Sequence, residues 1–502
     1  MASGTESEPL LPRDSRSSGS NHPRASDVEK DPQSKRPRQP KHSKTVNKII
    51  SAILGTSILL SITFTLTPRV IHGKISQHLH LDPLPQTVEQ RVNNILSDTP
   101  LIDGHNDLAI LIRSLYDNHI YDEKFTTPFE QGGMAMHVDL PRLKDGKNGG
   151  AFWSAYVPCP HNGSDFSDAN YAASQRDHTP PNCDIRRKLL GRIPVAFTLT
   201  QIDVLSRLRA AYPDHISPPP NSTTALPAFK AGQLISPLAI EGLHQIGNSV
   251  SNLRLFHSLG VRYATLTHNC HNIYADAALL EGEHGIEVAK PKWGGVSPAG
   301  RDLIHEMNRI GMIVDLAHVS QDTMRDVLGG SPDWEGSIAP PIYSHSSAYS
   351  ICPHPRNVPD DILQLVKKKN SIVMVNFSPD FVSCTANPSN PSGLPDFYPQ
   401  NSTLEHVVRH VKHIGELIGY EHVGFGSDFD GIPNTPKGLD DVSKFPYLVA
   451  ELLHQGLTDD QARGVVGGNV LRVWKEVDDV ALKMQASGQK PLEDRLPKLK
   501  WV

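Results

Sequence analysis

Short apolar runs that end in a chemically reactive side chain recur along the middle of the chain. The first is Leu101–Asp107, Leu-Ile-Asp-Gly-His-Asn-Asp, in which apolar residues lead to His105 and Asp107. Residues i and i+2 of an extended strand point to the same side. His105 and Asp107 are therefore predicted to face one point in space, as two ligands of one metal ion must.

Three later runs repeat this design: Leu238–Glu241, Met312–His318 and Pro341–His345. Three further apolar runs are also predicted as strands: Arg262–His268, Ser371–Phe377 and Val423–Asp428. Helical patterns lie between them, at Val250–Leu259, Ala299–Arg309, Asp360–Lys369 and Leu404–Ile418. Alternating strands and helices predict a parallel sheet. Seven such units favour an α/β fold of the (β/α)8 TIM-barrel type over an open sheet, with Ser217–Pro227 and Ala386–Asn401 as insertions.

Active sites of such barrels lie at the C-terminal ends of the strands. The reactive residues predicted at those ends are His105, Asp107, Glu241, His268, His318, His345 and Asp428. A single His that ends an apolar run is usually structural, but several in matching positions predict a shared site. Imidazoles and carboxylates without a thiolate suit Zn²⁺ or a similar divalent ion.

Two ions fit this set of side chains better than one. The ligands are too many for one open tetrahedral site, and the two oxygens of Glu241 can bridge two cations. Two such ions polarise a scissile carbonyl and acidify a shared water. The predicted nucleophile is therefore a hydroxide that bridges the metals.

Other histidines lack this context. His137-Val-Asp139 repeats the His-x-Asp pattern but follows no clear strand, so it is predicted to be a loop or structural feature. His305-Glu306 lacks the second His of a helical zinc-protease motif. The histidines predicted to be solvated are His119, His161, His354, His406, His410, His413 and His454.

The N-terminal part of the chain differs from the rest. Residues 1–44 are rich in Ser, Pro, Lys and Arg, and they are predicted to be a disordered, basic cytoplasmic tail. Ile49–Thr67 is uncharged and long enough to cross a bilayer, which needs about 20 residues. The segment 45–69 is thus predicted to be a single transmembrane signal-anchor, followed by a stalk over 70–85. The long polar tail argues against a cleaved signal peptide.

Basic residues before the apolar segment predict a cytoplasmic N-terminus and a catalytic domain that is lumenal or extracellular. This prediction fits both a vacuolar and a cell-surface location of that domain. Asn162, Asn221 and Asn401 in Asn-x-Ser/Thr triplets become glycosylation acceptors there. Asn376-Phe-Ser also matches, but it closes an apolar run and is predicted to be buried.

The composition of the chain narrows the class of protein but does not indicate a function. The 502 residues are 38% hydrophobic and 21% charged, which is ordinary for a globular protein with a large core. A net charge of -5 predicts no nucleic-acid partner. Five cysteines are too few for a domain built on disulfides.

Seven motifs in a fixed order resemble those of the renal, or membrane, dipeptidase family: Ile102–Asp107, Gly150–Cys159, Leu266–Cys270, Val314–Ser320, Ser344–Tyr349, Arg356–Asp360 and Gly426–Gly431. Members of that family are barrel metallopeptidases with two zinc ions. The resemblance covers about 86–478. It implies a barrel domain over 86–480, with 481–502 as a C-terminal tail.

The resemblance also implies roles for single residues. One zinc would be held by His105 and Asp107, the other by His318 and His345, and Glu241 would bridge them. His268 would polarise the substrate or stabilise the tetrahedral intermediate, and Arg356 would clamp the terminal carboxylate of the substrate. Asp428 would take a proton from the attacking water and pass it to the leaving amine.

Four of the five cysteines occupy positions that are bridged in similar proteins. The resemblance implies the disulfides Cys159–Cys270 and Cys352–Cys384. Cys183 is left over, and it either stays free or pairs with a second copy in a homodimer.

Three residues depart from the family pattern. Leu243 stands where a second glycine commonly follows the bridging Glu, and its side chain is expected to narrow the pocket. Ser427 replaces a frequent Gly, and Phe381 replaces a Tyr that some members carry near the substrate carboxylate. These departures leave the substrate preference open.

The implied function is a zinc-dependent membrane dipeptidase that hydrolyses the peptide bond of dipeptides and tolerates a D-residue at the C-terminal position. One alternative is another binuclear barrel amidohydrolase, acting on a cyclic amide, a lactone or a phosphoester. Such enzymes often bridge their metals with a modified Lys, where this chain has Glu241. A second alternative, an inactive membrane-tethered binding domain, is expected to have lost a ligand, and none is missing.

Overall fold

The structure is a computed structural model that describes residues 86–160, 165–167, 194–282 and 285–494. The predicted cytoplasmic tail, membrane segment and stalk lie outside these residues, as do His161, Asn162 and Cys183. Within the described ranges, no helix has both the length and the apolar character needed to cross a membrane.

Eight parallel strands form one sheet in the order β1-β2-β3-β4-β7-β8-β9-β12. The strands are β1 (Leu101–Asn106), β2 (Asn148–Ala155), β3 (Leu238–Glu241), β4 (Val261–Thr265), β7 (Ile313–Asp315), β8 (Ile342–Tyr343), β9 (Ile372–Val375) and β12 (Val423–Phe425). Seven of them lie within or overlap the predicted strands. β2 was not among those predictions, although its residues belong to one of the motifs that carry the family resemblance.

The first and last strands meet at their C-terminal ends. Asn106 and Phe429 form a parallel bridge. The backbone N–H of Asp107 donates to the carbonyl of Phe429 (2.9 Å), and that of Asp428 donates to the carbonyl of His105 (3.1 Å). The sheet is thus a nearly closed barrel, consistent with the predicted (β/α)8 fold.

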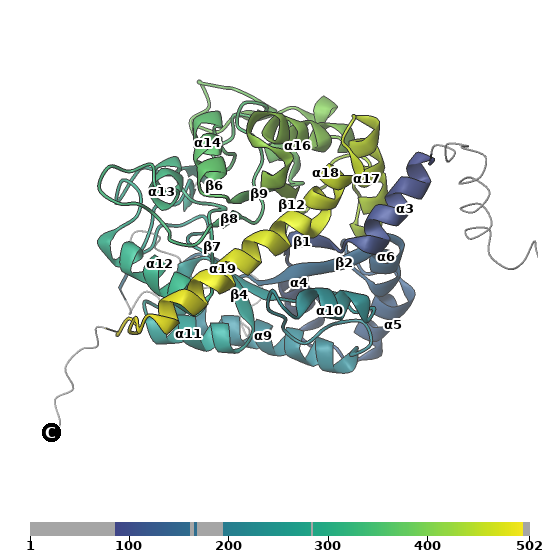
Figure 1. The fold of residues 1–502 in the computed structure, drawn as a ribbon, viewed down its shortest axis with the longest axis horizontal. Coiled ribbons are helices and arrows are strands. Elements are labelled where there is room, and N and C mark those ends of the chain that lie inside the picture. Colours follow the sequence, from purple (N-terminus) through teal and green to yellow (C-terminus); the bar gives the residue numbers. More distant parts are fainter. Residues whose placement is uncertain (1–85, 161–164, 168–193, 283–284, 495–502) are drawn as a thin grey trace, which may run out of the picture. The chain divides into compact units, whose positions relative to one another are not determined.

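Helices surround the barrel (Figure 1). They are α3 (Val88–Asp98), α4 (Leu108–Tyr116), α5 (Glu123–Gln131), α6 (Leu140–Asp145), α9 (Pro194–Ala211), α10 (Ala225–Lys230), α11 (Val250–Ser258), α12 (Pro298–Ile310), α13 (Gln321–Val327), α14 (Asp360–Lys368), α15 (Pro379–Val382), α16 (Leu404–Ile418), α17 (Phe445–His454), α18 (Asp459–Arg463) and α19 (Asn469–Ala486). α12 shows how the sequence sets such bounds. Ser297 caps its first turn, Pro298 begins it, and Gly311 ends it with a positive φ of 81°.

The C-terminal helix α19 runs across the barrel (Figure 1). Its buried Val470, Val473 and Trp474 join a cluster with apolar residues from the first half of several strands, including Ile102 and Ile313. α19 therefore covers the N-terminal mouth of the barrel, which leaves the opposite mouth for a site. The helix continues past residue 480, where the sequence had placed the end of the domain.

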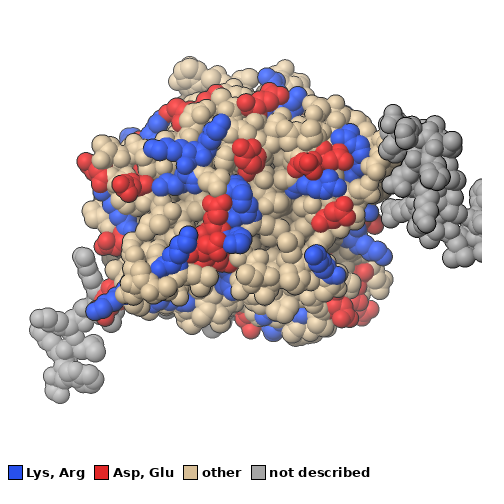
Figure 2. Space-filling model, viewed as in Figure 1, with Lys and Arg blue, Asp and Glu red and all other residues tan. Residues whose placement is uncertain are grey.

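Two short hairpins stand apart from the barrel sheet. One pairs β5 (Leu279–Gly282) with β6 (Gly285–Val288), and the other pairs β10 (Cys384–Thr385) with β11 (Asp396–Phe397). The connection between β10 and β11, and β11 itself, lie in the predicted insertion Ala386–Asn401. The backbone N–H of Val288 joins the two hairpins by donating to the carbonyl of Ser392 (2.9 Å). On the face in Figure 2, acidic and basic side chains are interspersed rather than segregated.

Candidate active site

Reactive side chains from the ends of four strands meet around the carboxylate of Glu241. Nε2 of His105 lies 3.0 Å from Oδ2 of Asp107 and 3.6 Å from Oε1 of Glu241. Nε2 of His318 and Nε2 of His345 lie 2.9 Å and 3.5 Å from that same Oε1 atom. The predicted ligands therefore converge, and all of them are buried.

Hydrogen bonds on the far side of each imidazole fix which nitrogen faces this point. The Tyr263 hydroxyl donates to the Gly104 carbonyl (3.1 Å), so it accepts from Nδ1–H of His105 (2.6 Å). Nδ1 of His318 lies 3.1 Å from the amide oxygen of Asn269, which only accepts. In both rings the lone pair is left on Nε2, which is the nitrogen that faces Glu241.

His345 follows the same rule through a buried carboxylate. The Ser344 hydroxyl donates to Oδ2 of Asp315 (2.7 Å) and accepts from Nδ1–H of His345 (2.8 Å). Asp315 also accepts from the backbone N–H of Ser344 (2.7 Å). Partners of this kind orient metal-binding histidines and raise their basicity.

Asp103 plays a similar part between the first and last strands. It accepts hydrogen bonds from the backbone N–H and the hydroxyl of Ser427, and burial raises its pKa to about 6. The hydroxyl that Ser427 adds to the family pattern thus faces another strand rather than the substrate. Asp103 and Asp315 were not predicted as site residues, although an Asp inside an apolar run is a signal that could have found them.

Electrostatics favours neutral rings at three positions and a cation beside the carboxylates. Burial lowers the pKa of His268, His318 and His345 well below its usual range. Burial also acts to lower the pKa of His105, but the neighbouring Tyr263, Asp107 and Glu241 raise it overall. A divalent ion at this position would replace that proton, since metal binding releases protons from its ligands.

The donor set fits a divalent metal. Three overlapping groups have ligand atoms within 4.8 Å of one another: His105, Glu241 and His345; Glu241, His268 and His318; and His105, Asp107 and Asp428. The buried Oδ1 atom of Asp107 has no hydrogen-bond partner among the described residues. An unpaired buried carboxylate oxygen is costly, and a cation would satisfy it.

Two of these side chains stand on unusual backbone. His318 has φ of 68° and Asp428 has φ of 65°, in the left-handed region that non-glycine residues rarely adopt. Such conformations cost of order 1 kcal/mol or more and cluster at functional sites. They turn each chain sharply just after its strand.

A cavity of about 620 Å³ opens above these ligands. Its wall includes Tyr156 at the end of β2, Leu279 from the first hairpin, and Phe381 and Leu394 from the region of the second. The volume lies in the usual range for small-molecule sites. A small molecule can therefore be enclosed between the hairpins and the strand ends.

One cation borders this cavity deep in the fold. Arg356 is only 2% exposed, and burial lowers its pKa to about 10, so it remains charged. Nη2 donates to the carbonyl of His345 (3.3 Å), and the guanidinium lies 4.9 Å from the centre of the Phe381 ring. Its Nε has no partner among the described residues.

Asp428 and His268 face the cavity from opposite sides. Asn376 donates to Oδ2 of Asp428 (3.1 Å), and burial raises the pKa of that carboxyl to about 7. The prediction that Asn376 is buried is confirmed. The His268 ring lies 4.4 Å from that of His318 and contacts Tyr156 edge-on at 5.0 Å.

Comparison with protein families decides the assignment. The family described as membrane dipeptidase, peptidase family M19, matches residues 89–488. The chain belongs to the membrane dipeptidase family. It is a metal-dependent dipeptidase.

Relatives and solved structures agree with this assignment. The chain is 41% identical to dipeptidase aclJ of Aspergillus oryzae, over 88% of this chain and 90% of that protein. It is also 41% identical to dipeptidase tcpJ of Claviceps purpurea, over 85% and 86%. A metallopeptidase from Rhodobacter sphaeroides, solved with a phosphinate mimic of the dipeptide L-Ala-D-Ala, is 26% identical with a TM-score of 0.58, covering 76% of this chain and 99% of that one.

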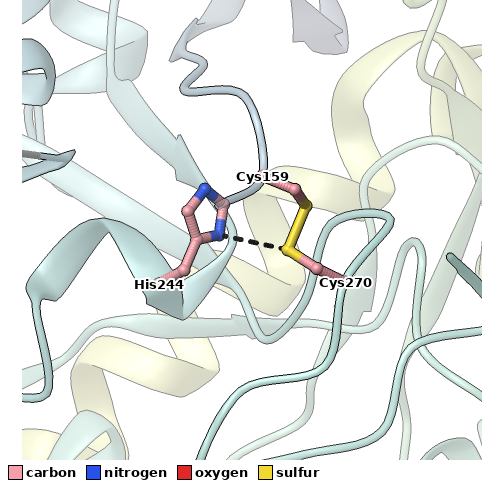
Figure 3. A group of neighbouring side chains, drawn as sticks. All are labelled: Cys159, His244 and Cys270. Atoms are coloured by element: carbon pink, nitrogen blue, oxygen red, sulfur yellow. Dashed lines mark hydrogen bonds between the residues drawn. A yellow bond between two sulfur atoms is a disulfide. The ribbon is translucent and has the colours of Figure 1, made fainter. Parts of the chain in front are cut away.

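Both predicted disulfides of this dipeptidase are confirmed. Cys159–Cys270 joins the end of β2 to the loop after β4, with a Cα–Cα distance of 5.9 Å. Cys352–Cys384 joins the Arg356 loop to β10, with a Cα–Cα distance of 5.0 Å. In Figure 3 the first bridge lies beside His244, whose Nδ1 is 4.0 Å from the Cys270 sulfur. Since both sulfurs are in the bridge, this group is no metal site.

Three predictions about single side chains were wrong. His354 and His410 are buried rather than solvated, and His354 lines the dipeptidase cavity. Leu243 packs fully buried in the main core and does not narrow the pocket. Of the other described histidines predicted as solvated, His119 and His454 are exposed, and His406 and His413 are half-buried.

The second His-x-Asp motif is structural, as predicted. Asp139 caps α6 by accepting from the backbone N–H of Arg142 (2.9 Å). Nδ1 of His137 accepts from the backbone N–H of Asp430 (2.9 Å). The motif thus braces the loop that carries Asp428, and contributes no side chain to the group of ligands.

Proposed function

We propose that this dipeptidase works with two Zn²⁺ ions and that its site residues act as the family resemblance implies. One zinc would be held by His105 and Asp107, the other by His318 and His345, with Glu241 shared. The observation that carries this proposal is the convergence of three imidazole Nε2 atoms within 3.6 Å of one Glu241 oxygen. Nitrogen and oxygen ligands without thiolate suit zinc.

The metal pair, when bound, supplies Lewis acidity to the scissile carbonyl and lowers the pKa of the attacking water. The remaining steps belong to the protein. Arg356 holds the terminal carboxylate, for which its planar fork is suited. His268 stabilises the negative charge that develops on the carbonyl oxygen.

Asp428 is the proposed proton carrier. With a pKa near 7, its carboxyl can accept a proton from the attacking water and return it to the leaving amine. Asn376 holds the carboxylate by donating to Oδ2. The substrate is a dipeptide, as the family and the named relatives indicate, and Arg356 would fix its carboxylate end. A D-residue is expected to be accepted at the C-terminal position, as the ligand of the Rhodobacter enzyme suggests.

We also propose that residues 45–69 anchor the enzyme with its N-terminus in the cytoplasm and its catalytic domain in a lumen or outside the cell. The apolar run and the basic residues before it support this placement. Exposed Asn221 and Asn401 are then glycan acceptors, as is Asn162. An N-terminal tag that is protease-accessible from the cytoplasm, with a glycosidase-sensitive mass, is expected. A tag protected inside the lumen would contradict this orientation.

Glu241→Gln tests the shared ligand. It keeps the shape of the side chain but removes its charge, so kcat/KM on L-Ala-D-Ala should fall by about 10³-fold or more. Bound zinc, measured by mass spectrometry, should fall below two per chain, while the circular dichroism spectrum stays unchanged. Wild-type activity in this variant, or wild-type turnover after removal of metal by a chelator, would exclude the proposal.

A further inference from the structure

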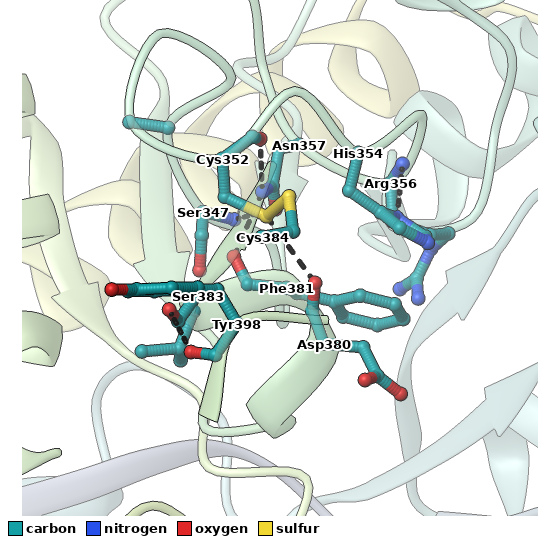
Figure 4. The surroundings of a disulfide bond; sticks show 12 residues. Ser347, Cys352, His354, Arg356, Asn357, Asp380, Phe381, Ser383, Cys384 and Tyr398 are labelled. Atoms are coloured by element: carbon teal, nitrogen blue, oxygen red, sulfur yellow. Dashed lines mark hydrogen bonds between the residues drawn. A yellow bond between two sulfur atoms is a disulfide. The ribbon is translucent and has the colours of Figure 1, made fainter. Parts of the chain in front are cut away.

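The carboxylate end of the cavity contains a side chain that the proposed mechanism does not use. His354 lines the cavity two residues before Arg356, and it is 5% exposed. Its ring lies 4.4 Å from that of Phe381, which also stacks against the Arg356 guanidinium. The phenyl ring offers no hydrogen bond, and His354 and Arg356 are the nitrogen donors beside it, while the carboxylate of Asp380 also lines the cavity (Figure 4).

The tautomer of His354 is fixed by its neighbour. The backbone N–H of Arg356 donates to Nδ1 of His354 (3.2 Å), which places the ring proton on Nε2. Burial, followed by the nearby guanidinium, lowers the pKa of His354 to about 3, so the ring is neutral at ordinary pH.

Nε2–H of His354 has no hydrogen-bond partner among the described residues. The only bond of this ring to them is the one at Nδ1. A donor that lines the cavity without a protein partner is available to water or to a bound ligand. A substrate carboxylate would supply the acceptor in place of water.

We propose that His354 is a second substrate-binding residue, which donates from Nε2–H to the C-terminal carboxylate of the dipeptide while Arg356 provides the charge. The proposal rests on the carboxylate-binding role proposed above for Arg356. A carboxylate has two oxygens with several lone pairs, so it can accept from both side chains at once. With His354 as a second donor, the site recognises the hydrogen-bonding geometry of a C-terminal carboxylate as well as its negative charge.

The scaffold around this pair is rigid, as such a role requires. Asn357 donates to the carbonyls of Cys352 and Phe381 (2.9 Å each) and accepts from the backbone N–H of Ser347 (3.0 Å). The Cys352–Cys384 bridge joins the same two segments covalently (Figure 4). The loop with His354 and Arg356 is thus fastened to the segment that carries Phe381.

The test compares L-Ala-L-Ala with its C-terminal amide in the zinc-loaded enzyme. His354→Phe keeps an aromatic ring against Phe381 but removes the donor. KM for the free acid should rise about 10-fold or more, the usual effect of losing one hydrogen bond to a charged group, with little change in kcat. KM for the amide should change less than twofold. His354→Gln, which retains an N–H donor, should recover part of the lost affinity.

His119→Phe is the matched control, because His119 is an exposed histidine outside the cavity, and its KM values should stay at wild type. An equal rise of KM for acid and amide in His354→Phe, or no rise for either, would overturn the proposal. If His354→Phe does not fold, His354→Leu, which also lacks a donor, is compared on the same two substrates and decides in the same way. Arg356→Ala tests the proposed function separately from the role of His354. If KM rises equally for the acid and the amide in this variant, Arg356 does not bind the carboxylate of the substrate.

Discussion

The two His-x-Asp motifs of this chain have the same spacing and similar burial, yet they have different uses. In His105-Asn-Asp107 the imidazole Nε2 and the carboxylate point at each other across 3.0 Å, in the space where other strand ends deliver their side chains. In His137-Val-Asp139 the carboxylate is occupied by Arg142, whose Nε lies 2.8 Å away. Spacing alone therefore does not make a metal site.

What separates the motifs is the place where each falls in the barrel. His105 is in a strand, and Asp107 follows directly at the rim, where Glu241 ends a second strand and His318 and His345 follow two others. His137 and Asp139 precede the short helix α6. A His-x-Asp pair becomes a ligand pair when unrelated segments converge on it. Elsewhere it satisfies the hydrogen-bonding groups of its own loop.

Asp107→Asn should break the first motif with the largest effect. The amide keeps the size of the side chain but cannot neutralise a cation, so kcat/KM should fall by about 10³-fold or more. Zinc content should fall with it, while the thermal transition of the metal-free protein stays near that of the wild type. A variant that retains both zinc and activity would remove the distinction between the two motifs.

Asp139→Ala should disrupt the second motif without changing catalysis. It removes a helix cap and the partner of Arg142, which together should lower the free energy of unfolding by about 2 kcal/mol. Urea unfolding of the zinc-loaded protein measures this, and kcat/KM should stay within about twofold of wild type. A loss of activity as deep as that of Asp107→Asn would show that both motifs serve the site.

The remaining expected effect leaves the protein unchanged near neutral pH, and it concerns a histidine that belongs to neither motif. Nδ1 of His410 accepts from the backbone of Ala348 (3.0 Å), Nε2–H donates to Val382 (2.8 Å), and burial lowers its pKa to about 3. Below pH of about 6.5 the unfolded chain binds a proton that the folded protein refuses. Stability should thus fall as pH drops from about 6.5 to about 3, by up to ~1.4 kcal/mol per pH unit for this group.

His410→Gln should remove that contribution and flatten the slope of unfolding free energy against pH by one proton. The slope is the measurement, since the substitution also lowers stability at every pH through lost packing. Urea unfolding at pH 5, 6 and 7 would show it. Parallel slopes in wild type and variant would mean that His410 takes up its proton in the folded state.

The contrast also explains what could be predicted from the sequence. Seven barrel strands and the converging ligands were predictable because each strand shows an apolar run, and all but Ser371–Phe377 have a reactive residue at their end. β2 was missed, since its Gly-Gly start and its Ser and Ala residues give no clear run and no terminal ligand. Because the strand order in a parallel barrel is regular, a few local patterns were enough to predict which strand-end ligands meet in the inner half of the site.

The outer half of the cavity follows no such rule. His354 and Phe381 lie in loop and short helical segments whose positions are set by a disulfide, by Asn357 and by ring contacts between distant segments. No periodicity within the loop indicates which way His354 points. Leu243 was misjudged for the same reason, because a turn after β3 directs it into the core.

The contact between the first and last strands of the barrel determines when the active site can form during synthesis of the chain. His105 and Asp107 leave the ribosome early, but the backbone bonds that seat them come from Asp428 and Phe429, more than three hundred residues later. Closing so long a loop is slow compared with forming a helix. A nascent chain is thus catalytically silent until translation is nearly complete, and premature termination before the last strand yields no partial enzyme.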